Sequence, residues 1–187
     1  SIIISNECLM KKLFTLIAFL YLFSTSPFAQ NSYLIVESGL AEPFSAFGNT
    51  HKNGFSSALS FAINPHYESR GFNYFLTASV GYQRFESNDD PNYVSHIVPI
   101  TFGAIFPFGQ DWFVPYLKGE VGAFIGEYDN GFEKVNETSF GFAPGVGFFF
   151  ALNRFWGLDI QAKFTKVLKK NDEIGYFGYH GGLVFRF

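Results

Sequence analysis

The residues best suited to catalysis gather near position 90. Ser95 and His96 are adjacent, Asp89 and Asp90 lie a few residues before them, and His51 occupies a separate polar segment. A serine, a histidine and an acid are the residue types of a nucleophilic hydrolase. Adjacent residues of an extended strand point to opposite faces, however, so Ser95 cannot easily serve His96. We therefore predict a protein without catalytic residues.

The other histidines and the polar turns give no metal or cofactor site. His66 lies in a short turn segment and His180 lies among alternating apolar residues, so both are expected to be structural. The segments DDPN (89–92) and YDNG (128–131) favour turns before calcium binding. The sequence has no metal-ligand spacing. We expect neither a cofactor nor a metal ion.

Six charged residues occur where polar and apolar residues alternate. They are three acids and three bases: Glu37, Lys118, Glu120, Asp159, Lys163 and Arg186. If they face one enclosed interior, unpaired charges would be costly and ion pairs are expected. Glu37 and Arg186 lie on the first and last segments, which meet if the sheet closes. The set predicts either a fixed network that plugs the interior or a gate whose pairs exchange partners; we favour the plug.

The elements that must position these residues are strands, because period-two alternation recurs along the chain and helical periodicity is absent. We expect eight strands, at 32–44, 54–64, 71–86, 93–106, 112–127, 138–151, 155–168 and 175–187. The seventh strand is the clearest, whereas apolar residues on both faces leave the register of the fourth open. Short turns are expected at 64–69, 107–111 and 151–154, and longer loops at 47–54, 86–93, 127–137 and 169–175. Short turns on one side and longer loops on the other are the layout of an outer-membrane barrel.

The composition of the two faces distinguishes a membrane barrel from a soluble one. The chain has 27 phenylalanines and 21% aromatic residues but only 16% charged residues, which is less charge than a soluble surface usually carries. The polar face is mostly small residues, and these suit the crowded interior of an eight-stranded barrel. Aromatic residues near strand ends are typical of membrane interfaces: Trp112, Tyr128, Trp156 and Tyr179. We therefore favour the membrane barrel over a soluble, lipocalin-like barrel.

The segment from Met10 to Gln30 is predicted to be a cleavable signal peptide. Lys11 and Lys12 precede an apolar run that is shorter than the roughly 20 residues of a spanning helix. Cys8, the only cysteine, lies before this run, so the mature chain would have no disulfide. We divide the chain into residues 1–29, which hold upstream residues and the signal peptide, and a barrel domain at 30–187.

The C-terminal stretch HGGLVFRF (180–187) resembles the assembly signal of outer-membrane barrels: a polar residue, a glycine and two aromatics. His180, Gly182, Phe185 and Phe187 occupy those places. The segment SGLAEPFSAFGNTHKNGFSSALSFA (38–62) resembles the first hairpin of the same proteins. The mature chain is thus similar to the porin-like outer-membrane β-barrel domain family, small eight-stranded kind. This resemblance implies an all-β, antiparallel, up-and-down transmembrane barrel, whose last strand is recognised by the barrel-assembly machinery.

The resemblance and the leader together imply a place in the bacterial outer membrane, with both termini periplasmic. The expected partners are outer-membrane lipids and the assembly machinery, with a surface ligand possible through the loops; near-neutral charge argues against nucleic acid. We expect a non-enzymatic role in envelope integrity or surface interaction. The alternatives are a small passive pore and, third, a lipid-modifying enzyme.

Overall fold

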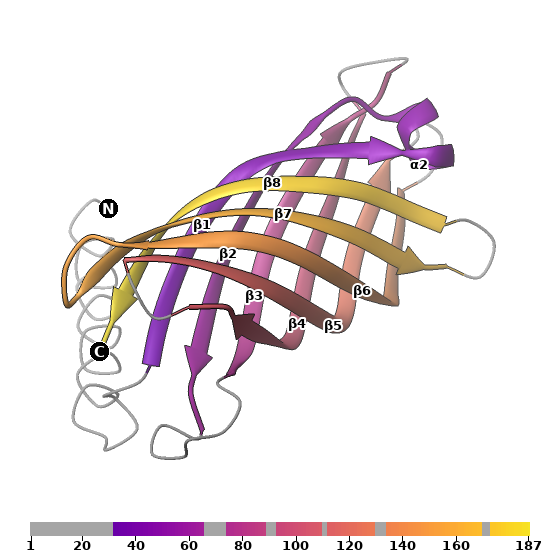
Figure 1. Cartoon of the computed structure of the whole chain (residues 1–187). Helices are drawn as coiled ribbons and strands as arrows, with labels where there is room; N and C mark the ends of the chain where they lie inside the picture. The colour runs from indigo at the N-terminus through magenta and orange to yellow at the C-terminus, as the bar shows by residue number, and fades with distance from the viewer. Residues whose placement is uncertain (1–31, 66–73, 89–92, 110–111, 130–133, 170–172) are drawn as a thin grey trace, which may run out of the picture.

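Eight long strands and one short helix form the part of the protein that a computed structural model describes (Figure 1). The structure describes residues 32–65, 74–88, 93–109, 112–129, 134–169 and 173–187. The strands are β1 (Ser32–Phe44), β2 (Gly54–Ile63), β3 (Phe75–Glu86), β4 (Val94–Pro107), β5 (Phe113–Asp129), β6 (Lys134–Ala151), β7 (Trp156–Leu168) and β8 (Glu173–Arg186). Helix α2 (Ser45–Thr50) lies between β1 and β2. The predicted signal peptide lies outside the described residues.

The strands close into a barrel in which each one pairs antiparallel with the next. The first and last strands complete the ring, in a register that runs from Tyr33 opposite Arg186 to Phe44 opposite Gly175. Figure 1 shows β8 lying beside β1 along this seam. Closure leaves no sheet edge with unpaired backbone groups. The predicted eight-stranded, up-and-down antiparallel barrel is confirmed.

The two ends of the barrel differ. Ser32 and Phe187 meet at one end, called the terminal end here, where the Phe187 amide donates to the Ser32 carbonyl at 3.0 Å. The other end carries α2 and is called the α2 end (Figure 1). At the terminal end, the turn at 152–155 is held by Asn153, whose side-chain oxygen accepts from the amides of Phe155 and Trp156 at 2.8 and 2.9 Å. This is the turn chemistry that favours asparagine.

Three local predictions were wrong. The third strand begins at Phe75 rather than at 71, and most of the predicted turn at 64–69 lies outside the described residues. The hairpin of β5 and β6 extends beyond its predicted limits because 17 residue pairs form along it, from Phe113 opposite Phe150 to Asp129 opposite Lys134, and these include polar residues. The polar loop after β1 contains a helix, α2, which starts at Ser45 with a positive φ of 60°. Six residues are too few for helical periodicity to be visible in the sequence.

The side chains alternate between the lumen and the outer surface along every strand. In β4, Ile97, Pro99 and Thr101 are buried, whereas Ile100 and Phe102 are exposed, and this fixes the register that the sequence left open. Large apolar side chains cover the middle of the outer surface, among them Leu40, Leu59, Val80, Ile100, Phe102, Val121, Val146, Ile160 and Leu183. In the described ranges, no helix is long and apolar enough to cross a membrane.

The barrel lumen as candidate functional site

The lumen is filled by three layers of side chains, of which the first lies at the terminal end and is apolar. Buried side chains from four strands form it, and three partly buried aromatic residues complete it: Ile35, Ile105, Tyr116 and Val184, with Tyr33, Phe75 and Phe149. The Tyr33 ring meets Phe75 edge-on, with ring centres 5.1 Å apart. We call this set the terminal-end apolar layer.

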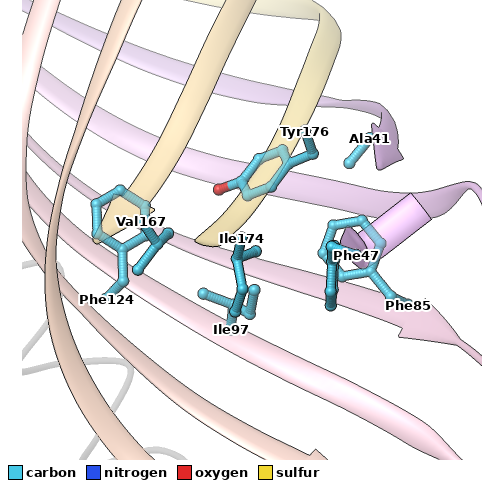
Figure 2. Packing of buried hydrophobic residues seen from close by; sticks show 8 residues of the cluster. All are labelled: Ala41, Phe47, Phe85, Ile97, Phe124, Val167, Ile174 and Tyr176. Carbon is cyan, nitrogen blue, oxygen red and sulfur yellow. The ribbon is translucent and has the colours of Figure 1, made fainter. Parts of the chain in front are cut away.

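A second apolar layer closes the α2 end. Figure 2 shows its eight side chains inside the barrel: Ala41, Phe47, Phe85, Ile97, Phe124, Val167, Ile174 and Tyr176. Phe47 comes from α2 and packs edge-on against Phe85 of β3, with ring centres 5.0 Å apart. The short helix therefore places an aromatic side chain into the mouth of the barrel. We call this set the α2-end apolar layer.

Charged side chains fill the space between the two apolar layers. Lys118 lies 3.2 Å from Glu120 on β5. The Lys163 ammonium on β7 lies 2.7 Å from a Glu37 carboxylate oxygen on β1 and 3.8 Å from Glu120. Lys163 thereby joins three strands across the lumen. Because each carboxylate here has an ammonium partner, the cost of burying its charge is offset.

Asp159 on β7 belongs to the same layer but has neutral partners. Its Oδ1 accepts from the Tyr116 hydroxyl at 2.8 Å, and its Oδ2 accepts from the Gln161 amide at 3.1 Å. The same Gln161 amide also donates to Glu37. We call Glu37, Lys118, Glu120, Asp159, Gln161 and Lys163 together the central charge layer.

Arg186 was expected in this network, paired with Glu37, but the structure places it elsewhere. It is exposed at the end of β8, and its guanidinium carbon lies 5.8 Å from the centre of the Tyr33 ring. The register explains the difference, because Glu37 stands opposite Gly182 and Arg186 stands opposite Tyr33. The alternation along β8 places Arg186 on an inward position. It lies beyond the terminal-end apolar layer, however, where it cannot reach Glu37.

The four residues of the predicted assembly signal occupy different environments, three on β8 and Phe187 directly after it. His180 points inward and its Nε2 lies 2.9 Å from the Ser56 hydroxyl. At Gly182, a Cβ atom would lie 2.7 Å from the Val36 carbonyl oxygen, so the seam requires a glycine. Phe185 packs outside against Trp156 with ring centres 4.2 Å apart, while Phe187 is exposed.

A small polar cavity lies between the central charge layer and the α2-end apolar layer. Its volume is about 30 Å³, and its polar lining includes Ser56, Ser79, Glu120, Lys163 and His180. One water needs roughly 10–15 Å³ of such space. The cavity therefore accommodates about two or three waters and excludes a metabolite.

Ser95 does have a histidine partner, but it is His51 rather than its neighbour. The Thr50 hydroxyl donates to the Phe47 carbonyl at 3.1 Å, so it accepts from Nδ1 of His51 at 2.8 Å. Nε2 of His51 then accepts from the Ser95 hydroxyl at 2.8 Å. A serine and its base are thus aligned, but a threonine orients the base and Ser95 is only 1% exposed. The His51–Ser95 hydrogen bond holds α2 in place over the α2 end of the barrel.

His96 faces outward, where its Nδ1 lies 2.7 Å from the Tyr82 hydroxyl. Sequence reasoning missed the His51–Ser95 contact because only the fold of the loop brings them together. It also missed Tyr116 and Gln161, although both fall on inward positions of the alternation. Among the described residues, no cluster of three or more histidine, cysteine or acidic side chains could hold a metal ion.

Comparison with known proteins identifies solved structures that share this barrel fold. No protein-family model matches the sequence, and no curated protein matches it. The crystal structure of Neisserial surface protein A (NspA) is similar at a TM-score of 0.65 and 21% identity, over 83% of this chain and 97% of that one. Ail, the attachment invasion locus protein of Yersinia pestis, gives 0.60 and 15% over 84% and 99%. The outer membrane enzyme PagL gives 0.53 and 14% over 83% and 99%.

These likenesses establish the fold. The chain is a small eight-stranded β-barrel of the outer-membrane type, with the same up-and-down closure as the solved structures.

Proposed function

We propose that this protein is a closed outer-membrane barrel that displays its α2-end loops at the cell surface and acts there without catalysis. The observation that carries the proposal is the filling of the lumen by two apolar layers around a charge layer. An ion would have to cross both apolar layers and disrupt the ion pairs between them. The role would be envelope integrity or surface interaction, rather than passive permeation.

The outer surface supports insertion into lipid. In the described middle part of each strand, the outward side chains are uncharged and mostly apolar, whereas outward charged residues such as Glu42, Arg84 and Lys166 lie toward the α2 end. An apolar band flanked by polar and aromatic residues is what a bilayer requires. Among the structures with this fold, Ail has also been crystallised with the heparin analogue sucrose octasulfate. That complex supports the surface-interaction form of the role; for this chain, the contact region that we propose is the α2-end loops.

Conductance in planar bilayers tests the closed lumen directly. Purified wild-type protein is expected to give no large, steady current. A steady open current from the wild-type barrel would overturn the proposal and support the passive pore.

Surface labelling tests the orientation. In a Cys8→Ser background, Lys52→Cys after α2 should react with a membrane-impermeant maleimide in intact cells. Leu152→Cys, in the turn at the terminal end and 61% exposed, is the matched control and should react only after lysis. The opposite pattern would reverse the orientation.

The enzymatic alternative has its own test. The buried Ser95 should not react with a fluorophosphonate probe in the refolded barrel. Labelling that disappears in both Ser95→Ala and His51→Gln would identify a hydrolase and contradict the non-enzymatic role.

A further inference from the structure

The central charge layer contains an excess of acids. It holds three carboxylates, Glu37, Glu120 and Asp159, and two ammonium groups, Lys118 and Lys163. If all five are ionised, three negative and two positive charges leave one excess negative charge. Two apolar layers separate this charge from bulk water, and an uncompensated charge in such surroundings is costly.

The contacts identify Asp159 as the unbalanced group. Among the described residues, Glu37 and Glu120 each have an ammonium within ion-pair distance, and Asp159 has none. In the part of the chain that the structure describes, its two oxygens receive hydrogen bonds only from Tyr116 and Gln161. Asp159 is 3% exposed and does not line the small polar cavity, so water does not solvate its charge.

His180 also faces this layer and could supply one positive charge if its ring were protonated, but the contacts of the ring disfavour this. The Nε2 atom of His180 bonds with Ser56, and its Nδ1 atom is buried without a hydrogen-bond partner in the described structure. Protonation at Nδ1 would add a buried N–H group with no acceptor, which is unfavourable. The remaining groups, Tyr116 and Tyr176, are hydroxyl donors to Asp159 and Gln83.

We propose that the lumen is a proton-binding site and that Asp159 carries the proton as a neutral carboxylic acid. The two remaining carboxylates then balance the two ammonium groups. Both contacts of Asp159 can persist in the protonated form: Oδ1 donates to the Tyr116 oxygen, whose own hydrogen turns away from Asp159, and Oδ2 still accepts from the Gln161 amide. The sealed interior is thereby electrically neutral.

Infrared spectroscopy of the refolded barrel at neutral pH tests the proton. Wild-type protein should show the carbonyl stretch of one protonated carboxyl group, distinct from the carboxylate bands. The band should shift when aspartate is labelled with ¹³C in its carboxyl group, and should not shift when glutamate is labelled. Asp159→Asn should abolish it. Absence of the band from the wild-type spectrum, or a shift with glutamate labelling, would overturn the proposal.

Glu120→Gln is the matched variant, because it removes a carboxylate that has an ammonium partner. Two acids then face two ammonium groups, so Asp159 must ionise and the band should disappear, although Asp159 is still present. Persistence of the band in Glu120→Gln would contradict charge balance as the cause.

A bound alkali ion is the competing source of positive charge. If an alkali ion is bound in place of the proton, the infrared band of the acid should be absent and the urea unfolding midpoint should differ between sodium chloride and choline chloride. That result would also overturn the proposal.

Discussion

At the scale of single residues, Lys163 joins the carboxylates of the lumen. Its ammonium contacts Glu37 at 2.7 Å and Glu120 at 3.8 Å, and its side chain is 11% exposed. Replacing Lys163 with Met keeps the volume but leaves Glu37 without its ammonium partner. We expect a loss of about 3–5 kcal/mol in the free energy of unfolding, the usual cost of an unpaired buried charge. Urea unfolding in lipid vesicles measures this loss.

Arg186→Gln is the control for that measurement. The sequence placed Arg186 in the same network, but it is exposed and stacks over Tyr33. Its removal should cost less than about 1 kcal/mol, as is usual for an exposed charge. Equal losses for the two variants would show that the lumen network is not what stabilises the barrel.

His51 gives the α2 end a dependence on pH. Burial against its surroundings lowers the pKa of the His51 imidazole below its ordinary 6.5. The neutral ring therefore stabilises the closed α2 end fully above pH 6.5, and this contribution is lost as the pH falls through 6.5 toward the lowered value. Hydrogen-exchange protection of the His51 and Lys52 amides, which bond to Phe47 and Glu86, should fall on acidification. His51→Gln should show no such pH dependence, and an equal decrease in this variant would contradict the role of His51.

At the scale of elements, β8 combines the closing seam with the predicted assembly signal. Phe187 contributes little to the folded barrel, because it is 41% exposed and its one described backbone contact reaches Ser32. If the assembly machinery reads this residue, its deletion should reduce the amount of assembled barrel in cells while export continues. Purified protein should still refold in detergent. Phe108→Ser, in the turn after β4 and 52% exposed, is the control. Unchanged levels of assembled protein without Phe187 would show that the signal is not read there.

The strands could be predicted from the sequence because alternation reports directly which face a residue occupies. The fixed period also placed Glu37, Lys118, Glu120, Asp159 and Lys163 on inward positions. It could not place Arg186, because parity gives the face of a residue and not its depth along the barrel. Depth depends on the register between strands, which only the closed sheet defines.

The contacts of α2 could not be predicted for a different reason. The helix is short, and its fixing contact joins His51 to Ser95, 44 positions apart. Nothing local in the sequence encodes that pair. The helix is stable because Phe47 is buried in the α2-end apolar layer, which forms only when the barrel closes.

At the scale of the whole molecule, closure depends on close contact between β1 and β8. A Cβ atom at Gly39 would lie 1.8 Å from the backbone oxygen of Tyr179, so any side chain there would push the two strands apart. Gly181 lies one pair further along the same seam, opposite Ser38, and a Cβ atom there would meet nothing within 4 Å. Substitutions at these two glycines therefore distinguish a failure of the β1–β8 seam to close from a general sensitivity of the two strands to the loss of a glycine.

The last prediction uses this pair to test the closed barrel. Unheated wild-type protein should migrate faster than boiled protein on a detergent gel, because the closed sheet resists unfolding by the gel detergent. Gly39→Val should lose this shift or lose it at a lower temperature, because β1 and β8 can no longer pair along their full length. Gly181→Val adds an apolar side chain to the outer surface and should keep the wild-type shift. If both variants behave like the wild type, the shift does not depend on the β1–β8 seam; if the wild type shows no shift, the closed membrane barrel itself is contradicted.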